Sequence, residues 1–175
     1  ARWLAADPPA MEEARSALEN IVADGKRARE VIGRIRALTK RQVPRMDLLD
    51  LNRKILEVLA FTEQELRSHD IVLETRLDST LPRVLGDRVQ LQQVLLNLIV
   101  NAIEAMSAVN DRPRELTIVS AQGTGGVVVE VRDSGIGFDQ EGAERVFDAF
   151  YTTKAEGLGI GLSISRSIVE AHGGR

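Results

Sequence analysis

The chain contains no cysteine, which excludes both a disulfide framework and a metal site built from thiolates. It also lacks a long apolar run. Its densest apolar stretch, residues 94–100, is interrupted by Asn97 and is far shorter than the roughly 20 residues that a membrane-spanning helix needs. The formal net charge of −3 gives no general attraction to nucleic acid or to an anionic membrane. We therefore expect no nucleic-acid partner and no membrane contact by this chain.

The remaining composition is that of a folded globular protein. Hydrophobic residues make up 43% of the chain and charged residues 28%, a balance that argues against disorder. A length of 175 residues accommodates one domain of ordinary size and a modest appendage. No secretory signal is visible and the chain starts at Ala1, so we expect an excised piece of a longer protein located in the cytoplasm.

Residues 10–42 are predicted to form one long helix. Pro8 and Pro9 precede this segment and Pro44 follows it, where helix punctuation is expected. A single apolar stripe on so long a helix is typical of packing against partner helices. The stripe consists of Ala14, Leu18, Ile21, Ala28, Ile32, Ile35 and Leu38.

The rest of the chain alternates helical and strand patterns. Apolar residues at every second position predict half-buried strands, and Asp87 followed by Gln90 predicts a capping box at the start of a helix. The expected elements are a helix over 51–68, a strand over 71–77, a helix over 88–107, strands over 115–122 and 126–132, and a helix over 160–172. This order predicts an α+β fold, a two-layer sandwich with helices on one face of a mixed sheet.

Two asparagines stand on one face of the predicted helix over 88–107. Asn97 and Asn101 are four residues apart, which makes them neighbours on the helix surface. An amide oxygen is a neutral, hard ligand that suits Mg²⁺. The same spacing also fits a helix in which one asparagine faces solvent and the other bonds to backbone.

A second polar motif, Asp-Ser-Gly-Ile-Gly at 133–137, ends the predicted strand over 126–132. Asp133 shares the parity of Val129 and Val131, so it is expected on the buried side of the sheet. A buried carboxylate needs a partner, and the exocyclic amine of adenine is a fitting donor. Gly135 and Gly137 permit backbone to approach a flat ring. An ordinary Asp-Ser-Gly turn is the alternative.

A glycine-rich segment opens the predicted helix over 160–172. Gly157, Gly159 and Gly161 stand at alternate positions, and amide groups at a helix start can converge on phosphate. A surface loop is the alternative. Just before it, three of the four phenylalanines and the only tyrosine lie between 138 and 151, which indicates a hinged flap with apolar anchors. Lys154 follows, either reaching phosphate or lying in solvent.

The two histidines, His69 and His172, lie at helix ends with no carboxylate or second histidine at catalytic or metal spacing. We expect structural roles for both, and His172 is placed to interact with a helix C-terminus.

Taken together, these segments resemble the catalytic core of two-component sensor histidine kinases. Residues 92–104 resemble the asparagine box of that family, and residues 133–137 its first glycine box. Residues 146–154 resemble its phenylalanine box, and residues 157–162 its second glycine box. The resemblance covers about 71–174 and implies a Bergerat-type ATP-binding fold.

The resemblance also implies site roles and cofactors. ATP and Mg²⁺ are the expected cofactors: Asn101 would hold the metal, Asn97 would support it, Asp133 would read adenine, and the loop over 157–162 would wrap the phosphates. The catalytic residues implied are Asn97 and Lys154. The ATP-binding set implied is Asn97, Asn101, Asp133, Gly135, Gly137, Thr153, Lys154, Gly157, Leu158, Gly159, Ile160, Gly161 and Leu162.

One residue distinguishes the expected reaction from hydrolysis. In related ATPases of the gyrase and Hsp90 kind, the position matching Asn97 is a glutamate that activates water. An amide cannot act as that base. The site is therefore expected to deliver the γ-phosphoryl group to an external nucleophile by positioning and charge neutralisation.

The resemblance further predicts the domain organisation. Residues 1–44 resemble the second helix of the dimerisation hairpin, without the helix that bears the acceptor histidine, and residues 45–175 resemble the ATP-binding catalytic domain without its last strands. The intact protein, cytoplasmic or the cytoplasmic part of a membrane-bound sensor, would form a homodimer through helix 10–42. It would phosphorylate a histidine outside this fragment and then a response regulator receiver domain. The alternatives are an ATPase of the gyrase or mismatch-repair type and a non-catalytic, nucleotide-sensing scaffold.

Overall fold

The computed structural model describes residues 11–12, 15–18, 21, 45–154 and 157–175. The chain divides into two compact units, 1–42 and 43–175. In the first unit the described residues are helical, and the rest of the predicted helix over 10–42 lies outside the described residues. All elements discussed below belong to the second unit.

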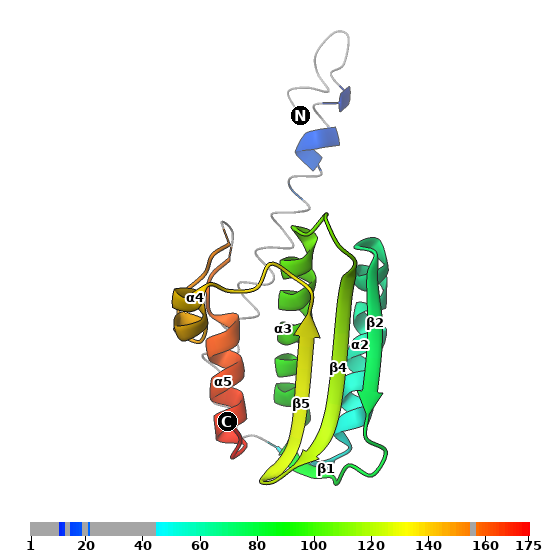
Figure 1. Ribbon diagram of the computed structural model, residues 1–175, viewed down its shortest axis with the longest axis vertical. Coiled ribbons are helices and arrows are strands. Elements are labelled where there is room, and N and C mark those ends of the chain that lie inside the picture. The colour runs from blue at the N-terminus through cyan, green and yellow to red at the C-terminus, as the bar shows by residue number, and fades with distance from the viewer. Residues whose placement is uncertain (1–10, 13–14, 19–20, 22–44, 155–156) are drawn as a thin grey trace. The chain divides into compact units, whose positions relative to one another are not determined.

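A three-stranded mixed sheet forms one layer of the second unit. Strand β2 (Ile71–Leu77) runs parallel to β4 (Arg114–Gly123), which pairs antiparallel with β5 (Gly126–Asp133). Helices α2 (Leu51–Ser68) and α3 (Arg88–Ser107) cover one face of this sheet (Figure 1). The predicted α+β sandwich with helices on one face of a mixed sheet is therefore confirmed.

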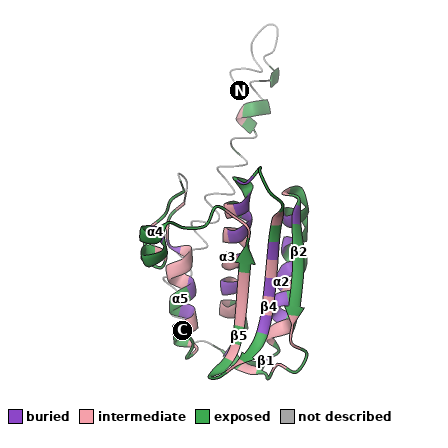
Figure 2. Ribbon diagram, viewed as in Figure 1, coloured by how far each residue is buried: buried purple, intermediate pink, exposed green. Residues whose placement is uncertain are grey.

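The core lies between these two layers, where buried residues concentrate on the facing sides of β4 and the helices (Figure 2). On β4 the alternating residues Leu116 and Ile118 are fully buried. They belong to one apolar cluster with Ile55 of α2 and with Ile99 and Met106 of α3. Burial of such aliphatic side chains stabilises the fold by about 1.5–3 kcal/mol each. This packing fixes the position of α3 against the sheet.

The N-terminus of α3 is capped by Asp87. Its Oδ1 accepts hydrogen bonds from the backbone N–H groups of Val89 and Gln90 at 2.9 and 3.0 Å, and its Oδ2 accepts from that of Arg45 at 2.8 Å. Burial raises the pKa of Asp87, but these three donors outweigh burial and hold the pKa below its ordinary value. The cap is therefore charged, as the positive end of a helix favours.

The second half of the predicted capping box is wrong. The Gln90 side chain does not return to the backbone N–H of Asp87, which instead donates to His172 Nε2 at 2.9 Å. His172 Nδ1 lies 2.7 Å from the carbonyl oxygen of Ile168 and donates to it, so the imidazole is neutral with its proton on Nδ1. The predicted structural role of His172 is confirmed, through a contact between residues 85 positions apart that local spacing does not encode.

Three short elements were absent from the sequence prediction. Strands β1 (Met46–Leu49) and β3 (Val84–Asp87) form a separate two-stranded antiparallel sheet, and α4 (Gln140–Arg145) lies in the aromatic segment. Four or six residues are too few for an apolar period to emerge. The last helix, α5 (Gly161–Ala171), lies beside α3 and ends before Gly173, whose φ of +75° is readily adopted only by glycine.

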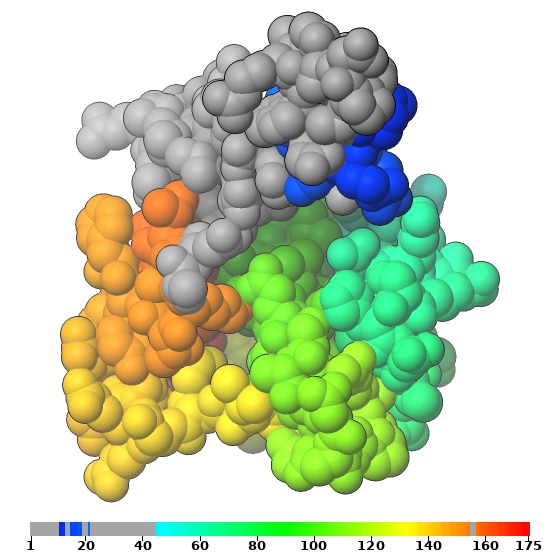
Figure 3. Space-filling model, turned by 90° about the horizontal axis from the view of Figure 1, so that it is seen from above, coloured from blue at the N-terminus to red at the C-terminus, as the bar shows by residue number. Residues whose placement is uncertain are grey.

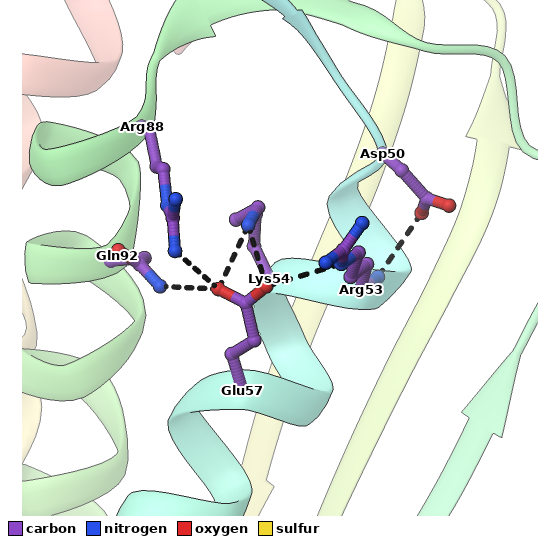
Figure 4. A network of polar contacts seen from close by, with 6 residues as sticks. All are labelled: Asp50, Arg53, Lys54, Glu57, Arg88 and Gln92. Carbon is purple, nitrogen blue, oxygen red and sulfur yellow. Dashed lines mark hydrogen bonds and ion pairs between the residues drawn. The ribbon is translucent and has the colours of Figure 1, made fainter.

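A polar network joins α2 to α3 at their outer surface (Figure 4). Glu57 of α2 accepts two hydrogen bonds from the almost fully buried Lys54, at 2.7 and 2.8 Å. From α3, Arg88 and Gln92 donate to the same carboxylate at 3.2 and 2.9 Å. The hydrogen bond from Lys54 lowers the pKa of Glu57 most, and the positive charges around it lower that pKa further.

This network predicts acid-dependent stability. Because the pKa of Glu57 is lowered in the folded state, its contribution to stability is present above the ordinary value of 4.5 and is lost as the pH falls below it. We expect Glu57→Gln to lower the free energy of unfolding near neutral pH. The difference in free energy of unfolding between this variant and the wild type should be smaller at acidic pH. Urea unfolding at both pH values measures this. The matched control Glu63→Gln, which removes an exposed pair with Arg67, should change little; an equal effect of both variants would contradict the prediction.

Candidate functional site

Helix α3 carries the candidate site on the side that the sheet does not cover. Ile99 and Met106 are buried in the core, whereas Asn97, Asn101 and Glu104 retain access to solvent. Segments distant in the sequence contact α3 at these positions. The site is therefore a series of contacts along one helix.

Asn97 lies against the start of α5. Its Nδ2 donates to Oγ of the buried Ser165 at 3.0 Å, which fixes the orientation of the amide. Its Oδ1 lies so close to Gly161 that a side-chain carbon at this glycine would overlap it. The structure thus brings together Asn97 and the second glycine segment, as the sequence predicted.

Asn101, one helical turn further on, lies beside Lys154. The ammonium group of Lys154 forms an ion pair with Glu104 and lies 3.5 Å from Asn101 Oδ1. Lys154 and Glu104 are both about half exposed, with 42% and 47% of their side chains accessible. The sequence left open whether Lys154 reaches phosphate or lies in solvent; in this structure its ammonium group contacts two residues of α3.

The loop after β5 contacts the next turn of α3. Gly135 packs so closely on Ala105 that a side-chain carbon would lie 2.7 Å from the Ala105 Cβ. The backbone N–H of Ile136 donates to the Ala105 carbonyl at 3.4 Å. Asp133 Oδ1 accepts from the Gly135 backbone N–H at 2.9 Å. The predicted burial of Asp133 is wrong, because the strand ends there and its side chain is exposed.

The glycine segment before α5 leaves a helix start without a side-chain cap. Ile160 occupies the N-cap position, where its buried apolar side chain cannot accept a hydrogen bond. Gly159 has a φ of +62° and packs against the backbone of Tyr151, and its carbonyl accepts from the Phe150 N–H at 2.9 Å. The start of α5 thus lacks a side-chain cap, and Asn97 lies against its first residue, Gly161.

The remaining predicted site residues differ in exposure and in their local contacts. Gly137 has a φ of +68° and is exposed, and no hydrogen bond of the Thr153 side chain exists among the described residues. Leu158 is 39% exposed, and Leu162 is half-buried. Gly157 packs against Thr152 and supports the turn that carries Lys154.

The aromatic segment between 138 and 151 differs from the prediction of apolar anchors. Phe138, Phe147 and Phe150 are exposed by 61%, 46% and 80%. Only Tyr151 is half-buried, under the guanidinium group of Arg145 at 4.5 Å from its ring centroid. Figure 3 shows this segment, coloured yellow to orange, at the surface.

Three residues that support the site were not predicted. Ser165 orients Asn97, and Glu104 pairs with Lys154. Arg112 donates to the carbonyl oxygens of Ser134 and Gly135 at 3.1 and 2.7 Å and so holds the loop after β5. The sequence contained a signal for Glu104, because it lies three residues after Asn101 on the same helix. No feature of the sequence indicated the role of Arg112.

A cavity of about 380 Å³ lies elsewhere and contains none of the predicted site residues. Its lining comes from the ends of α2 and α3 and from β1: Asp47, Leu48, Leu49, Asp50, Arg53, Lys54, Arg83 and Arg88.

Comparison with known families identifies this arrangement. Residues 86–175, which include α3, the loop after β5 and α5, match the family described as histidine kinase-, DNA gyrase B- and HSP90-like ATPases. The chain belongs to this family. The ATP-binding fold expected from the four motifs is thereby confirmed, and the match includes every predicted site residue.

Relatives within this ATPase family are sensor histidine kinases. The chain is 37% identical over 176 residues to the sensor histidine kinase TmoS of Ectopseudomonas mendocina, covering 99% of this chain and 18% of TmoS. It is 38% identical over 166 residues to the C4-dicarboxylate transport sensor protein DctS of Rhodobacter capsulatus, covering 95% of this chain and 25% of DctS. The chain thus spans about a quarter or less of these relatives' length.

Solved structures of this family show the same fold. The catalytic domain of histidine kinase ThkA is 36% identical, with a TM-score of 0.64 over 73% of this chain and 81% of that domain. ThkA in complex with the response regulator protein TrrA is 30% identical in the aligned part, with a TM-score of 0.74 over 92% of this chain and 45% of that one.

Two further findings concern the described part of the chain only. None of its helices combines the length and the apolar character that a membrane crossing requires. No three acidic, histidine or cysteine side chains gather there into a possible metal cluster.

The contact between Gly161 and Asn97 yields a stability prediction. We expect Gly161→Ala to displace Asn97 from Ser165 and to lower the free energy of unfolding by about 1–3 kcal/mol, as overpacking of close contacts does. Urea unfolding gives this value, and the side-chain amide resonances of Asn97 report its displacement. The control Gly125→Ala meets no atom within 4 Å in the β4–β5 turn and should leave both readouts nearly unchanged. Unchanged Asn97 resonances in Gly161→Ala would contradict the prediction.

Proposed function

We propose that this chain is the ATP-binding catalytic part of a sensor histidine kinase, which transfers the γ-phosphoryl group of ATP to a histidine on a separate helix. The observation that carries this proposal is the convergence of Asn97, Asn101, the loop after β5 and the start of α5 along one side of α3. The family membership supports ATP as the substrate.

Each predicted site residue then has a separate task. Asp133, exposed beside α3, accepts a hydrogen bond from the exocyclic amine of adenine, whereas guanine presents an acceptor there and is repelled. The backbone N–H groups at the start of α5 receive the phosphates, because uncapped helix starts attract anions. Gly137, where an added side-chain carbon would meet no atom within 4 Å, leaves room for the nucleotide, whereas Gly135, Gly157 and Gly159 let the surrounding loops pack closely on Ala105, Thr152 and Tyr151. Thr153 and Lys154 face the phosphates.

The residues present fit a magnesium ion that travels with the nucleotide. Asn101 Oδ1 already lies 3.5 Å from an ammonium group, so this oxygen is accessible to a cation. The scarcity of clustered acidic ligands in the described residues agrees with Mg²⁺, which takes most of its ligands from phosphate and water. Asn101 would hold the ion, and bound Mg²⁺ neutralises charge on the phosphates.

The residue at position 97 favours transfer over hydrolysis. Its amide donates to Ser165 and has no basic group to activate a water molecule. The chain therefore holds and orients the triphosphate, and an acceptor histidine supplies the nucleophile.

We further propose that residues 1–44 contribute the second helix of a dimerisation hairpin, that the intact protein is a homodimer, and that a response regulator receiver domain takes the phosphoryl group next. The complex of ThkA with its response regulator supports this last partner.

The adenine role of Asp133 is testable by nucleotide titration. We expect the wild type to prefer ATP to GTP, and Asp133→Asn to weaken ATP binding about 10-fold or more, because hydrogen bonds to charged groups contribute about 1.5–3 kcal/mol. The ratio of ATP affinity to GTP affinity should be smaller in this variant than in the wild type, because the carboxylate that repels guanine is gone. Calorimetric titration of both nucleotides measures the two quantities.

The matched control is Asp47→Asn, which removes the same charge from β1, at a residue outside the proposed ATP-binding set. It should leave the affinity for ATP unchanged. Equal affinity of the wild type for ATP and GTP would contradict the proposed reading of adenine.

The transfer step needs an acceptor supplied in a second polypeptide. With labelled ATP, Mg²⁺ and a helix bearing the acceptor histidine, we expect label that is stable in base and labile in acid, as phosphohistidine is. ATP binding without label on histidine would favour a nucleotide-sensing scaffold. ATP hydrolysis at an appreciable rate without acceptor would favour an ATPase of the gyrase or mismatch-repair type.

A further inference from the structure

Glu104 is a charged side chain on α3, beside Asn101, for which the proposed reaction has no use. It lies three residues after Asn101, and its carboxylate pairs with Lys154, which reaches α3 from the segment before the second glycine box. A carboxylate at this place would repel a triphosphate held by Asn101 and by the start of α5. Its presence beside the phosphate side of the site therefore requires an explanation.

The contacts of Lys154 supply that explanation. The ammonium group of Lys154 donates to the carboxylate of Glu104 and also lies 3.5 Å from Asn101 Oδ1. This oxygen is the one proposed to hold Mg²⁺, and an ammonium group and a metal ion cannot both occupy it. The oxygen that would hold the metal thus lies beside the ammonium group of Lys154, which has Glu104 as its counter-ion.

The backbone around Lys154 indicates which part moves. Its N–H donates to Thr152 Oγ1 at 3.1 Å, and its carbonyl accepts from the Gly157 N–H at 3.2 Å. These two bonds hold the main chain of Lys154 in a local turn. The side chain, four methylene groups long and half exposed, is free to exchange one anion for another without a change of that turn.

We infer that Glu104 is a positioning residue that holds Lys154 on α3 until nucleotide binds and competes with the nucleotide phosphates for its ammonium group. Binding of ATP with its metal exchanges the partner of Lys154 from Glu104 to phosphate and frees Asn101 Oδ1. Glu104 thereby lowers the affinity for nucleotide. This inference rests on the proposed function, because it takes the anion that competes with Glu104 to be ATP.

The test is a double-mutant cycle on ATP affinity with Glu104→Gln, Lys154→Gln and the double variant, each titrated with ATP in Mg²⁺ and in EDTA. We expect Glu104→Gln to tighten ATP binding in both conditions. The substitution Glu104→Gln should increase ATP affinity by a larger factor when Lys154 is present than when it is replaced by Gln. The two factors should differ about two- to fivefold, the range that partly exposed ion pairs contribute. Glu63→Gln, which removes an exposed ion pair on α2, is the matched control and should leave the affinity unchanged.

The outcomes separate this inference from the function on which it rests. No binding of ATP to the wild type would overturn the proposed function. If the wild type binds ATP, an unchanged ATP affinity of Glu104→Gln overturns the inference. The same increase in ATP affinity with and without Lys154 also overturns it, because Glu104 would then act by charge repulsion of the nucleotide alone. Weaker binding in Mg²⁺ alone would make Glu104 a metal ligand and would likewise overturn it. Since Glu104 and Lys154 are half exposed, neither substitution should impair folding, and urea unfolding verifies this.

Discussion

The structure depends on the two-sided packing of α3. One side of this helix places Ile99 and Met106 in the core, where they meet Leu116 and Ile118 of the central strand. The other side presents amides and a carboxylate to the segments that follow β5. Because the core fixes the rotation of the helix about its axis, it also fixes the direction of Asn97 and Asn101. The positions of the polar groups thus follow from apolar packing on the opposite side.

Contacts from distant parts of the chain complete the arrangement. At one end, His172 joins the end of α5 to the cap of α3; in the middle, Ser165 holds Asn97; further along, Gly135 packs on Ala105. Each contact involves a single turn of α3. Together they place α5 and the loop after β5 along the same helix, which is the geometry that a triphosphate and its base need.

The balance of charge near Asn101 suits the proposed nucleotide site, which must fill and empty. Under that proposal Lys154 alone would attract phosphate strongly, and Glu104 would offset part of this attraction. The aromatic residues between 138 and 151 are largely exposed, so this segment is held to the domain by few apolar contacts. Weak attachment beside a phosphate site is typical of segments that move when a ligand binds.

The sequence by itself determined the long helices and strands, because their apolar periods are set by burial on one side, and it determined the four motifs that define the family. It did not determine the short β1–β3 sheet or α4, whose four to six residues carry too little pattern. The tertiary structure alone decided the exposure of Asp133, the bond from Asp87 to His172 and the pairing of Lys154 with Glu104. The two side-chain contacts join residues more than thirty positions apart, and the exposure of Asp133 depends on where β5 ends. Local spacing in the sequence encodes neither.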